Sequence, residues 1–321
     1  MIATAFALPK VAVLLTVYNG MYYLEEQIQS ILQQTQVDLT LFVSIDFSTD
    51  GSEIWVNELA KREARIVVLP YGEKFGGAGR NFFRLVRDVD FSSFDYVSFS
   101  DQDDIWYPHK LNRAISFLDN SPYDGYSSNV LAFWPDGKQK LINKSGAQQN
   151  WDFIFEAAGP GCTYVMTVKL MLAIKKKMLE VWDLLQTVTL HDWFFYAFAR
   201  AKGYQWFIDS EPTMLYRQHA ANQVGVNKGI KAYLSRLKKI KNGWWLSQSL
   251  LIAQLTDSYQ TEFIQSWALL GRLEFLSLAR RAFQCRRDGQ EKYFFFFVCL
   301  LFAIIGGQKK YGKKQFINYL K

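Results

Sequence analysis

The chain has 321 residues, of which half are apolar and 17% are aromatic, and its formal net charge is +7 at neutral pH. This composition excludes a disordered chain, and the length accommodates one large domain or a domain with an appended region. Basic residues crowd the chain from Lys228 onward, so the excess charge indicates a regional partner, such as nucleic acid, anionic lipid or an acidic substrate.

The first half of the chain alternates strand-like and helix-like segments. The N-terminus lacks the basic region of a signal peptide and runs directly into a buried strand at residues 11–15. Leu24 and Ile28 then recur at helical spacing in a helix predicted at residues 20–33. Further strands are predicted at residues 39–45, 66–69 and 96–99, and helices at residues 53–62 and 82–89. The alternation predicts an α/β fold with a mainly parallel sheet flanked by helices.

Polar side chains follow several of these strands. Tyr18 and Asn19 follow the first, Asp46 the second and Asp101 the fourth. Ligands of parallel sheets bind beyond the carboxyl ends of the strands, so we expect one crevice to collect these side chains. Asp46 is either an acceptor for a base or ribose or an ordinary turn aspartate.

Two features of the loops between these strands concern local structure. Asp50 is expected to cap the helix that follows it. The glycine-rich residues 76–79 match neither the dinucleotide fingerprint nor the phosphate-binding P-loop. They are predicted to form a flexible turn that leads into a helix, because glycine supplies positive φ there.

The stretch SDQDDIWYPHK places Asp101, Asp103 and Asp104 within four positions. Like charges this close raise one another's pKa unless a cation neutralises them, and a hard divalent cation such as Mg²⁺ or Mn²⁺ removes the conflict. The alternative is helix capping by Asp104 or a neighbour, since Pro108 suits the first turn of a helix beginning near His109.

The second half of the chain holds two further polar groups. LHDWFFYAFARAKG sets His191 and Asp192 before an aromatic helix, where Asp192 is either an N-cap or a base that accepts a proton from an acceptor hydroxyl. YRQHAANQVG supplies Arg217 and His219, which suit a diphosphate and a metal ion respectively, or are simply surface residues. A lysine-bearing helix is expected at residues 169–179.

Composition becomes basic and aromatic around residues 226–229, which predicts a catalytic domain at residues 1–227 and a basic, amphipathic helical region at residues 228–321. Residues 293–305 carry no charge, but a membrane-spanning helix needs roughly 20 apolar residues. Because lysines follow, this segment predicts either a helix lying on an anionic membrane surface or a buried helix. The separated Cys162, Cys285 and Cys299 lack metal-binding spacing and indicate a reducing compartment.

The order of the motifs carries a resemblance. VAVLLTVYNG, SIDFSTDGS, NFFRLV, SDQDDIWYPHKL, GCTYVMTVKL, HDWFFYAFARAKG and YRQHAANQVG follow one another along the chain. In this order they resemble a family 2 glycosyltransferase with the GT-A fold, and more narrowly the bacterial rhamnosyltransferases. The resemblance covers about residues 10–225, and SDQDDIW, HDWFF and YRQHAANQVG are its most specific pieces.

The resemblance implies inverting, metal-dependent transfer of a sugar from a nucleoside diphosphate, dTDP-rhamnose by analogy, to a hydroxyl of a cell-surface polysaccharide, O-antigen or lipid-linked glycan precursor. Asp192 would be the catalytic base. The implied nucleotide-sugar contacts are Thr16, Tyr18, Asn19, Asp46, Asp101 and Arg217. The implied ligands of Mg²⁺ or Mn²⁺ are Asp103, Asp101 and His219. Cys162, His191 and Trp193 would line the acceptor or sugar pocket.

One departure from the family pattern lies at the end of the second predicted strand. Ile45 and Phe47 stand where family members usually carry an acid and a glycine. Two alternatives therefore stay open: a catalytically silent subunit that binds a nucleotide sugar or glycan, and a GT-A enzyme with another donor such as a UDP-hexose. The expected location is the cytoplasm, peripherally on the inner face of the bacterial membrane, with an anionic membrane surface and no nucleic acid as partner.

Overall fold

The structure is a computed structural model that describes residues 7–219, 240 and 242–306. Its larger sheet contains β1 (Lys10–Val17), β2 (Asp38–Ile45), β3 (Ile66–Val68), β4 (Tyr96–Ser100), β6 (Gly125–Ser128), β9 (Val165–Thr167) and β10 (Trp206–Asp209). The seven strands lie in the order β10-β6-β9-β4-β1-β2-β3. Only β9 runs antiparallel to its neighbours, so the predicted mainly parallel α/β sheet is confirmed, with one reversed strand that the residue pattern did not reveal.

The register of this sheet places the ends of three strands side by side. Val17 of β1 lies opposite Ile45 of β2, and Leu15 lies opposite Ser100 of β4. The carboxyl ends of these three strands therefore meet at one edge of the sheet. The residues that follow them in the sequence are brought together there, as expected for a parallel sheet.

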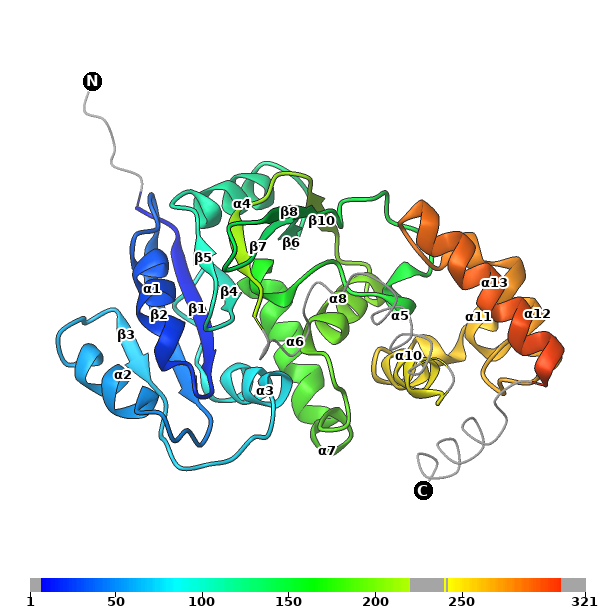
Figure 1. Ribbon diagram of the computed structural model, residues 1–321, viewed down its shortest axis with the longest axis horizontal. Helices are drawn as coiled ribbons and strands as arrows, with labels where there is room; N and C mark the ends of the chain where they lie inside the picture. The colour runs from blue at the N-terminus through cyan, green and yellow to red at the C-terminus, as the bar shows by residue number, and fades with distance from the viewer. Residues whose placement is uncertain (1–6, 220–239, 241, 307–321) are drawn as a thin grey trace.

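Helices cover both faces of the sheet (Figure 1). Apolar residues at helical spacing turn inward, as Leu24, Ile28 and Ile31 do in α1. The helix α3 begins at Ala78, earlier than predicted, because Gly76 and Gly77 take positive φ angles of 75° and 152° and complete the turn before it. The helices of this part are α1 (Met21–Leu32), α2 (Ser52–Ala60), α3 (Ala78–Asp88), α4 (Lys110–Asp119), α5 (Asp152–Phe155), α6 (Val168–Glu180), α7 (Trp182–Leu185) and α8 (His191–Ala201).

A smaller sheet flanks the carboxyl edge of β4. It consists of β5 (Ile105–Trp106), β11 (Met214–Arg217), β7 (Val130–Phe133) and β8 (Gln139–Ile142), in that order. β11 is antiparallel to β5 and parallel to β7. β5 begins directly after Asp104. Because β11 pairs with β5, the residues at the end of β11 lie close to the acidic stretch.

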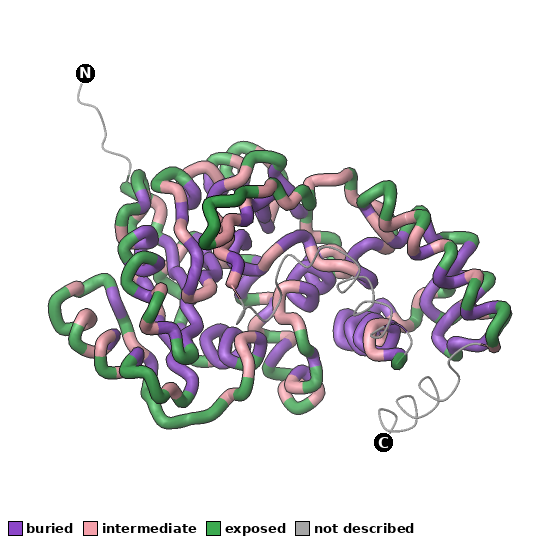
Figure 2. The backbone as a smooth tube through the Cα atoms, viewed as in Figure 1, coloured by how far each residue is buried: buried purple, intermediate pink, exposed green. Residues whose placement is uncertain are grey.

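The C-terminal helices pack onto the part of the chain that contains the larger sheet, through a shared apolar core. They are α10 (Trp244–Leu255), α11 (Glu262–Gln265), α12 (Arg272–Arg280) and α13 (Gly289–Ile305), at the opposite end of the molecule from β3 and α2 (Figure 1). The buried rings of Phe155, Phe195 and Trp267 belong to one core that continues from the sheet into these helices, as the buried backbone in Figure 2 indicates. The predicted boundary at residues 226–229 lies outside the described residues.

The helix α13 is apolar on two faces. Phe295, Cys299 and Phe302 are buried against the rest of the chain, whereas Phe297 and Ile304 are 62% and 73% exposed. One face of α13 is therefore buried, as one alternative predicted, and the opposite face exposes apolar side chains to solvent. Among the described residues, no helix has the length and apolarity needed to cross a membrane.

Candidate active site

The loops after β1, β2 and β4 are tied together at the crevice. The backbone N–H of Tyr18 donates to Oε1 of Gln102 (2.7 Å), and Nε2 of Gln102 donates back to the carbonyl of Tyr18 (3.0 Å). The backbone N–H of Thr49 donates to Oδ1 of Asn19 (2.8 Å), whose φ of 45° lies in the left-handed region that asparagine tolerates. Thr16 is buried within β1, while the Tyr18 ring is exposed. Tyr18 and Asn19 therefore lie beside Gln102 and Thr49 at the carboxyl edge of the sheet.

Asp46 is buried at the end of β2, where it anchors the glycine-rich loop. Its Oδ1 accepts hydrogen bonds from the backbone N–H groups of Phe47 (2.8 Å) and Phe75 (2.9 Å), and its Oδ2 accepts from that of Gly76 (2.9 Å). These bonds use most of the acceptor capacity of a carboxylate, and through them Asp46 holds the turn that leads to α3. Asp50 accepts from the backbone N–H of Ser52 (3.0 Å), the first residue of α2.

The acidic cluster, Asp101, Asp103 and Asp104, lies just beyond β4 and beside the thiol of Cys162. Ligand atoms of Asp101, Asp104 and Cys162 all lie within 4.8 Å of one another. Burial, then the charges of Asp103 and Asp192, raise the pKa of Asp101 to about 7. Burial and the charges of Asp103 and Asp101 raise the pKa of Asp104 well above its ordinary value. This is the conflict of like charges that the sequence predicts.

The capping alternative for Asp104 is wrong. His109 occupies the N-cap position of α4 without a side-chain bond, and the backbone N–H of Leu111 in the first turn donates to Oε1 of Gln34 (3.0 Å). Asp104 is instead fully buried, and its Oδ1 accepts a hydrogen bond from the backbone N–H of Arg217 (3.0 Å). Arg217, the last residue of β11, thus ties the smaller sheet to the acidic cluster, 113 residues earlier in the sequence.

Arg217 and His219 both reach the acidic cluster. Nε of Arg217 donates to the carbonyl of Asp103 (2.8 Å), and its guanidinium pairs with Glu26. Nε2 of His219 lies 2.7 Å from Oδ2 of Asp103. The Tyr23 ring lies near both side chains, with its centre 4.6 Å from the Arg217 guanidinium and 4.9 Å from the centre of the His219 ring. Neither residue is an unattached surface group.

Lys110 is a cation that the sequence analysis missed. It is the first residue of α4 and fully buried, with Nζ 3.5 Å from the centre of the Trp106 ring. Burial, opposed by the charges of Cys162 and Asp104, lowers its pKa to about 7. A lysine at a helix start normally suggests solvent exposure. The spacing of four residues from Trp106 is the one sequence signal that it packs against an aromatic ring.

Asp192 faces the acidic cluster from the start of α8. Leu190 is the N-cap of this helix, so Asp192 lies inside the first turn, and the N-cap alternative is wrong. The backbone N–H groups of Trp193 and Gly161 both hydrogen-bond to its carboxylate. A Cβ atom on Gly161 would lie only 3.1 Å from Cβ of Asp192 and 2.7 Å from Nε2 of His191, so glycine permits this close approach. Burial nevertheless raises the pKa of Asp192 to about 6.

The two neighbours of Asp192 have different surroundings. The His191 ring lies 4.1 Å from the ring of Phe82, and burial lowers its pKa to about 3, so the imidazole is neutral. Trp193 is buried, and its indole Nε1 donates to the carbonyl of Phe153 (2.9 Å). In this conformation Trp193 braces α5, whereas His191 and Cys162 lie at the crevice.

The geometry combines two chemical capabilities. The acidic cluster offers several oxygen ligands, which are those that hard cations prefer. Asp192 is ionised at neutral pH, yet its pKa of about 6 leaves it a better proton acceptor than an ordinary aspartate. The charge of Asp192 contributes to the raised pKa of Asp101, so the two groups belong to one electrostatic site.

Comparison with known proteins agrees with this geometry. Residues 12–225 match the glycosyl transferase family 2 domain. The chain is similar to the dTDP-rhamnosyl transferase RfbG of Shigella flexneri, with 42% identity over 286 residues, covering 88% of this chain and 98% of the relative. It is also similar to the uncharacterized glycosyltransferase alr2836 of Nostoc sp., with 30% identity over 43% of this chain and 41% of the relative.

Solved structures share the fold at low sequence identity. The 1–349 fragment of S. aureus TarS in complex with UDP-GlcNAc has a TM-score of 0.51 at 14% identity, covering 92% of this chain and 89% of that chain. The same fragment in complex with UDP has a TM-score of 0.52 with the same coverage. The fold is thus of the GT-A type, the family match spans most of the chain, and the protein belongs to glycosyl transferase family 2 and is a glycosyltransferase.

Proposed function

We propose that this enzyme transfers rhamnose from dTDP-rhamnose to a hydroxyl of a cell-surface polysaccharide, O-antigen or lipid-linked glycan precursor, with inversion at the anomeric carbon. The main support for this proposal is the 42% identity to a dTDP-rhamnosyl transferase over 88% of this chain and 98% of the relative. The crevice bordered by Tyr18, Asn19 and Asp101 supports a nucleotide-sugar donor at the carboxyl edge of the sheet.

The donor site includes a divalent cation, Mg²⁺ or Mn²⁺, in this proposal. The oxygen ligands of the acidic cluster fit such an ion, because carboxylates whose pKa values are raised by burial and by mutual repulsion gain most from a cation. Asp101, Asp103 and His219 would hold the ion. When bound, the ion would neutralise charge on the departing nucleoside diphosphate.

The residues of the chain supply the remaining chemistry. The carboxylate of Asp192 accepts the proton of the attacking hydroxyl, and the N–H groups of Trp193 and Gly161 hold that carboxylate in place. Arg217 keeps the acidic cluster in position through its bonds to Asp103 and Asp104. His191 is neutral, so it adds no positive charge that would lower the proton affinity of the base.

A donor screen tests the proposed function. Purified protein with Mg²⁺ or Mn²⁺ is incubated with a panel of nucleotide sugars, including dTDP-rhamnose and UDP-hexoses, and a set of glycan acceptors, and products are identified by mass. We expect transfer or slow hydrolysis of dTDP-rhamnose. Turnover of a UDP-hexose alone would replace the donor assignment, and binding of nucleotide sugars without any turnover would favour the silent binding subunit.

Stabilisation by the cation is expected to depend on pH. The raised pKa of Asp101, about 7, means that its contribution to folding is favourable while it is protonated and is lost as pH rises through 7. A bound cation replaces that proton, so Mg²⁺ with dTDP should raise the unfolding midpoint more at about pH 8 than at about pH 6. Differential scanning fluorimetry measures both shifts, with dTDP alone as control. Equal shifts at the two pH values would contradict the expectation.

We further propose that the exposed face of α13 attaches the enzyme to an anionic membrane. Tyr293, Phe297, Leu301 and Ile304 repeat at helical spacing on this face and are all exposed. Phe283 extends the apolar surface through an edge contact with Tyr293, at 5.1 Å between ring centres. The sequence continues after α13 with Lys309, Lys310, Lys313 and Lys314, and this charge complements anionic headgroups.

Vesicle sedimentation tests the membrane proposal. A Phe297→Asp/Leu301→Asp double variant should lose most of its binding to vesicles containing phosphatidylglycerol, because charged side chains on this face oppose insertion among lipids. The matched control is Leu172→Asp/Leu179→Asp, which alters two exposed leucines on α6. Equal loss in both double variants, or unchanged binding in the first, would remove α13 from the attachment site.

A further inference from the structure

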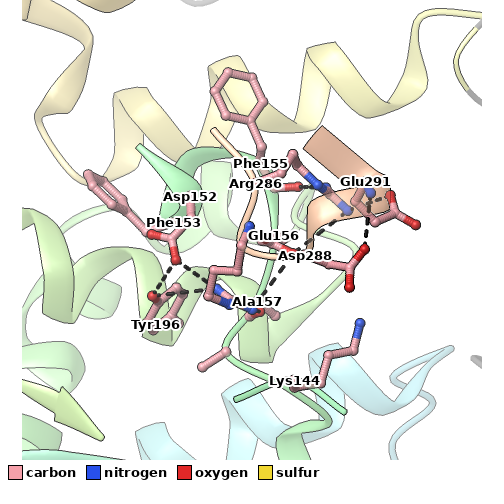
Figure 3. Close-up of polar contacts among 12 residues, drawn as sticks. Lys144, Asp152, Phe153, Phe155, Glu156, Ala157, Tyr196, Arg286, Asp288 and Glu291 are labelled. Carbon is pink, nitrogen blue, oxygen red and sulfur yellow. Dashed lines mark hydrogen bonds and ion pairs between the residues drawn. The ribbon is translucent and has the colours of Figure 1, made fainter. Parts of the chain in front are cut away.

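A mostly buried ionic cluster joins the start of α13 to α5 and to Tyr196 of α8 (Figure 3). Arg286 and Arg287, which precede α13, reach the 152–157 segment, defined as α5 with Glu156 and Ala157. Arg286 donates to the carbonyl of Phe155 (2.9 Å) and pairs with Glu291 (3.0 Å). Arg287 also fixes this segment through its backbone, since its N–H donates to Glu156 Oε1 (2.7 Å).

The side chain of Arg287 connects two chain segments. Its Nη1 donates to Oδ2 of Asp152 (2.9 Å) and lies 3.5 Å from the hydroxyl of Tyr196 on α8. Its Nη2 donates to the carbonyl of Ala157. The guanidinium is almost completely buried, so it makes these contacts away from solvent screening. One side chain of the C-terminal region thereby holds both α8 and the 152–157 segment.

Asp152 completes the cluster. It is fully buried and accepts hydrogen bonds from Tyr196 (3.0 Å), Arg200 (3.1 Å) and Arg287 (2.9 Å). The nearby charges of Asp152 and Glu156 raise the pKa of Arg287 against the effect of its burial, so the guanidinium stays charged. Because every partner is charged or hydrogen-bonded, removal of one leaves an uncompensated buried group.

Both segments held by Arg287 lead directly to Asp192. Tyr196 lies one helical turn after Asp192, and Ala157 lies four residues before Gly161, whose N–H bonds to the Asp192 carboxylate. Trp193 adds a parallel tie between α8 and α5 through the carbonyl of Phe153. The separation between the Asp192 carboxylate and its Gly161 donor therefore depends on how α8 and the 152–157 segment are held together.

Lys144 lies on the crevice side of the cluster. Its Cβ is close to Gly159, where an added Cβ would lie 3.7 Å away, and Gly159 precedes Gly161 by two residues. Its ammonium group interacts electrostatically with Glu156, Arg286, Arg287 and Asp192. The cluster and the catalytic carboxylate are thus adjacent parts of one charged region, although Arg287 itself does not contact Asp192.

We propose that Arg287 is a positioning residue, through which the C-terminal helices hold the Gly161 backbone N–H and Asp192 in their catalytic arrangement. The inference rests on the proposed role of Asp192 as base. It assigns the C-terminal region a task in catalysis that is separate from attachment to a membrane. Arg287→Lys keeps the positive charge and should retain part of this function. Arg287→Met, an uncharged side chain of similar length, should not.

The test compares Arg287→Met with Arg286→Met and Arg287→Lys. Arg286 binds the same 152–157 segment and Glu291, and among the described residues no hydrogen bond or ion pair joins it to α8, so its variant reports a general weakening of the C-terminal packing. We expect Arg287→Met to lower kcat by about ten- to a hundred-fold with donor KM unchanged, because small misplacement of a catalytic group has effects of this size. Arg286→Met should retain kcat within about two-fold on the same argument. Arg287→Lys should lie between Arg287→Met and the unmodified enzyme.

Hydrogen–deuterium exchange adds a readout that needs no turnover. Peptides covering residues 157–163 and 190–196 should exchange faster in Arg287→Met than in Arg286→Met. If Arg287→Met does not fold, Tyr196→Phe replaces it, since this change removes only the hydroxyl that contacts Asp152, Arg200 and Arg287. Equal losses of kcat in the two arginine variants, or exchange that is unchanged at both segments, would overturn the proposal. An inactive unmodified enzyme with the expected exchange pattern would instead refute the proposed function alone.

Discussion

The Asp192→Asn variant is expected to lose about 10²–10⁴-fold in kcat while its affinity for dTDP is retained, because an amide cannot accept the proton of the attacking hydroxyl. Asparagine preserves the size of the side chain and one oxygen for the N–H groups of Trp193 and Gly161. Steady-state transfer at saturating donor and metal measures kcat, and isothermal titration with dTDP measures binding.

The control for this variant is Asp183→Asn. Asp183 also lies in the first turn of a helix, α7, but it is exposed and distant in sequence from the acidic cluster. It should retain full turnover. Substantial activity in Asp192→Asn would show that another group accepts the proton, and loss of dTDP binding would mean that the substitution disturbs the donor site.

The second large effect is expected for Asp103→Ala, which should reduce metal-dependent turnover by about 100-fold or more. Loss of a group that merely supports a metal ligand already costs about 10–100-fold in metal affinity or activity, and a ligand should cost at least as much. The same change removes the partner of His219, which lies 2.7 Å from the Asp103 carboxylate. Turnover measured across a Mn²⁺ titration should therefore show both a lower maximum and a higher half-saturating concentration.

Asp136→Ala is the control for the metal variant. Asp136 is an exposed aspartate in the turn between β7 and β8, where it accepts a hydrogen bond from the N–H of Lys138 (3.1 Å). Its Mn²⁺ dependence should match that of the unmodified enzyme. An Asp103→Ala enzyme with an unchanged Mn²⁺ curve would exclude Asp103 from the metal site and leave Asp101 and Asp104 as the remaining carboxylates.

The fully buried Lys110 gives the acidic cluster an internal counter-charge. Burial lowers the pKa of Lys110 to about 7, while the charges of Cys162 and Asp104 oppose that shift. Lys110 belongs to the motif SDQDDIWYPHKL, but no role was expected for it there. It lies in the acidic stretch itself, six residues after Asp104, and only packing against Trp106 brings it behind the carboxylates.

Local periodicity was enough to predict the repeated elements of the first half. The helix predicted at residues 20–33 and the strand after Asp95 follow directly from apolar spacing, which depends on burial of one face of each element. The reversed direction of β9 did not follow from its residues, because a short apolar strand has the same pattern in either direction. Its direction is set by its pairing with both β4 and β6, which are distant from it in the sequence.

The acidic stretch, HDW and RQH are each short unbroken runs of sequence, and their residue types and order alone indicated the family and the residues expected to carry its chemistry. The tertiary structure decided which of them cap helices. Asp104 and Asp192 both had capping as an alternative, and only the observed N-caps, His109 and Leu190, excluded it. Asp46 and Arg287 acquired partners more than twenty residues away, and such contacts are set by packing of the whole chain, since no local pattern specifies them.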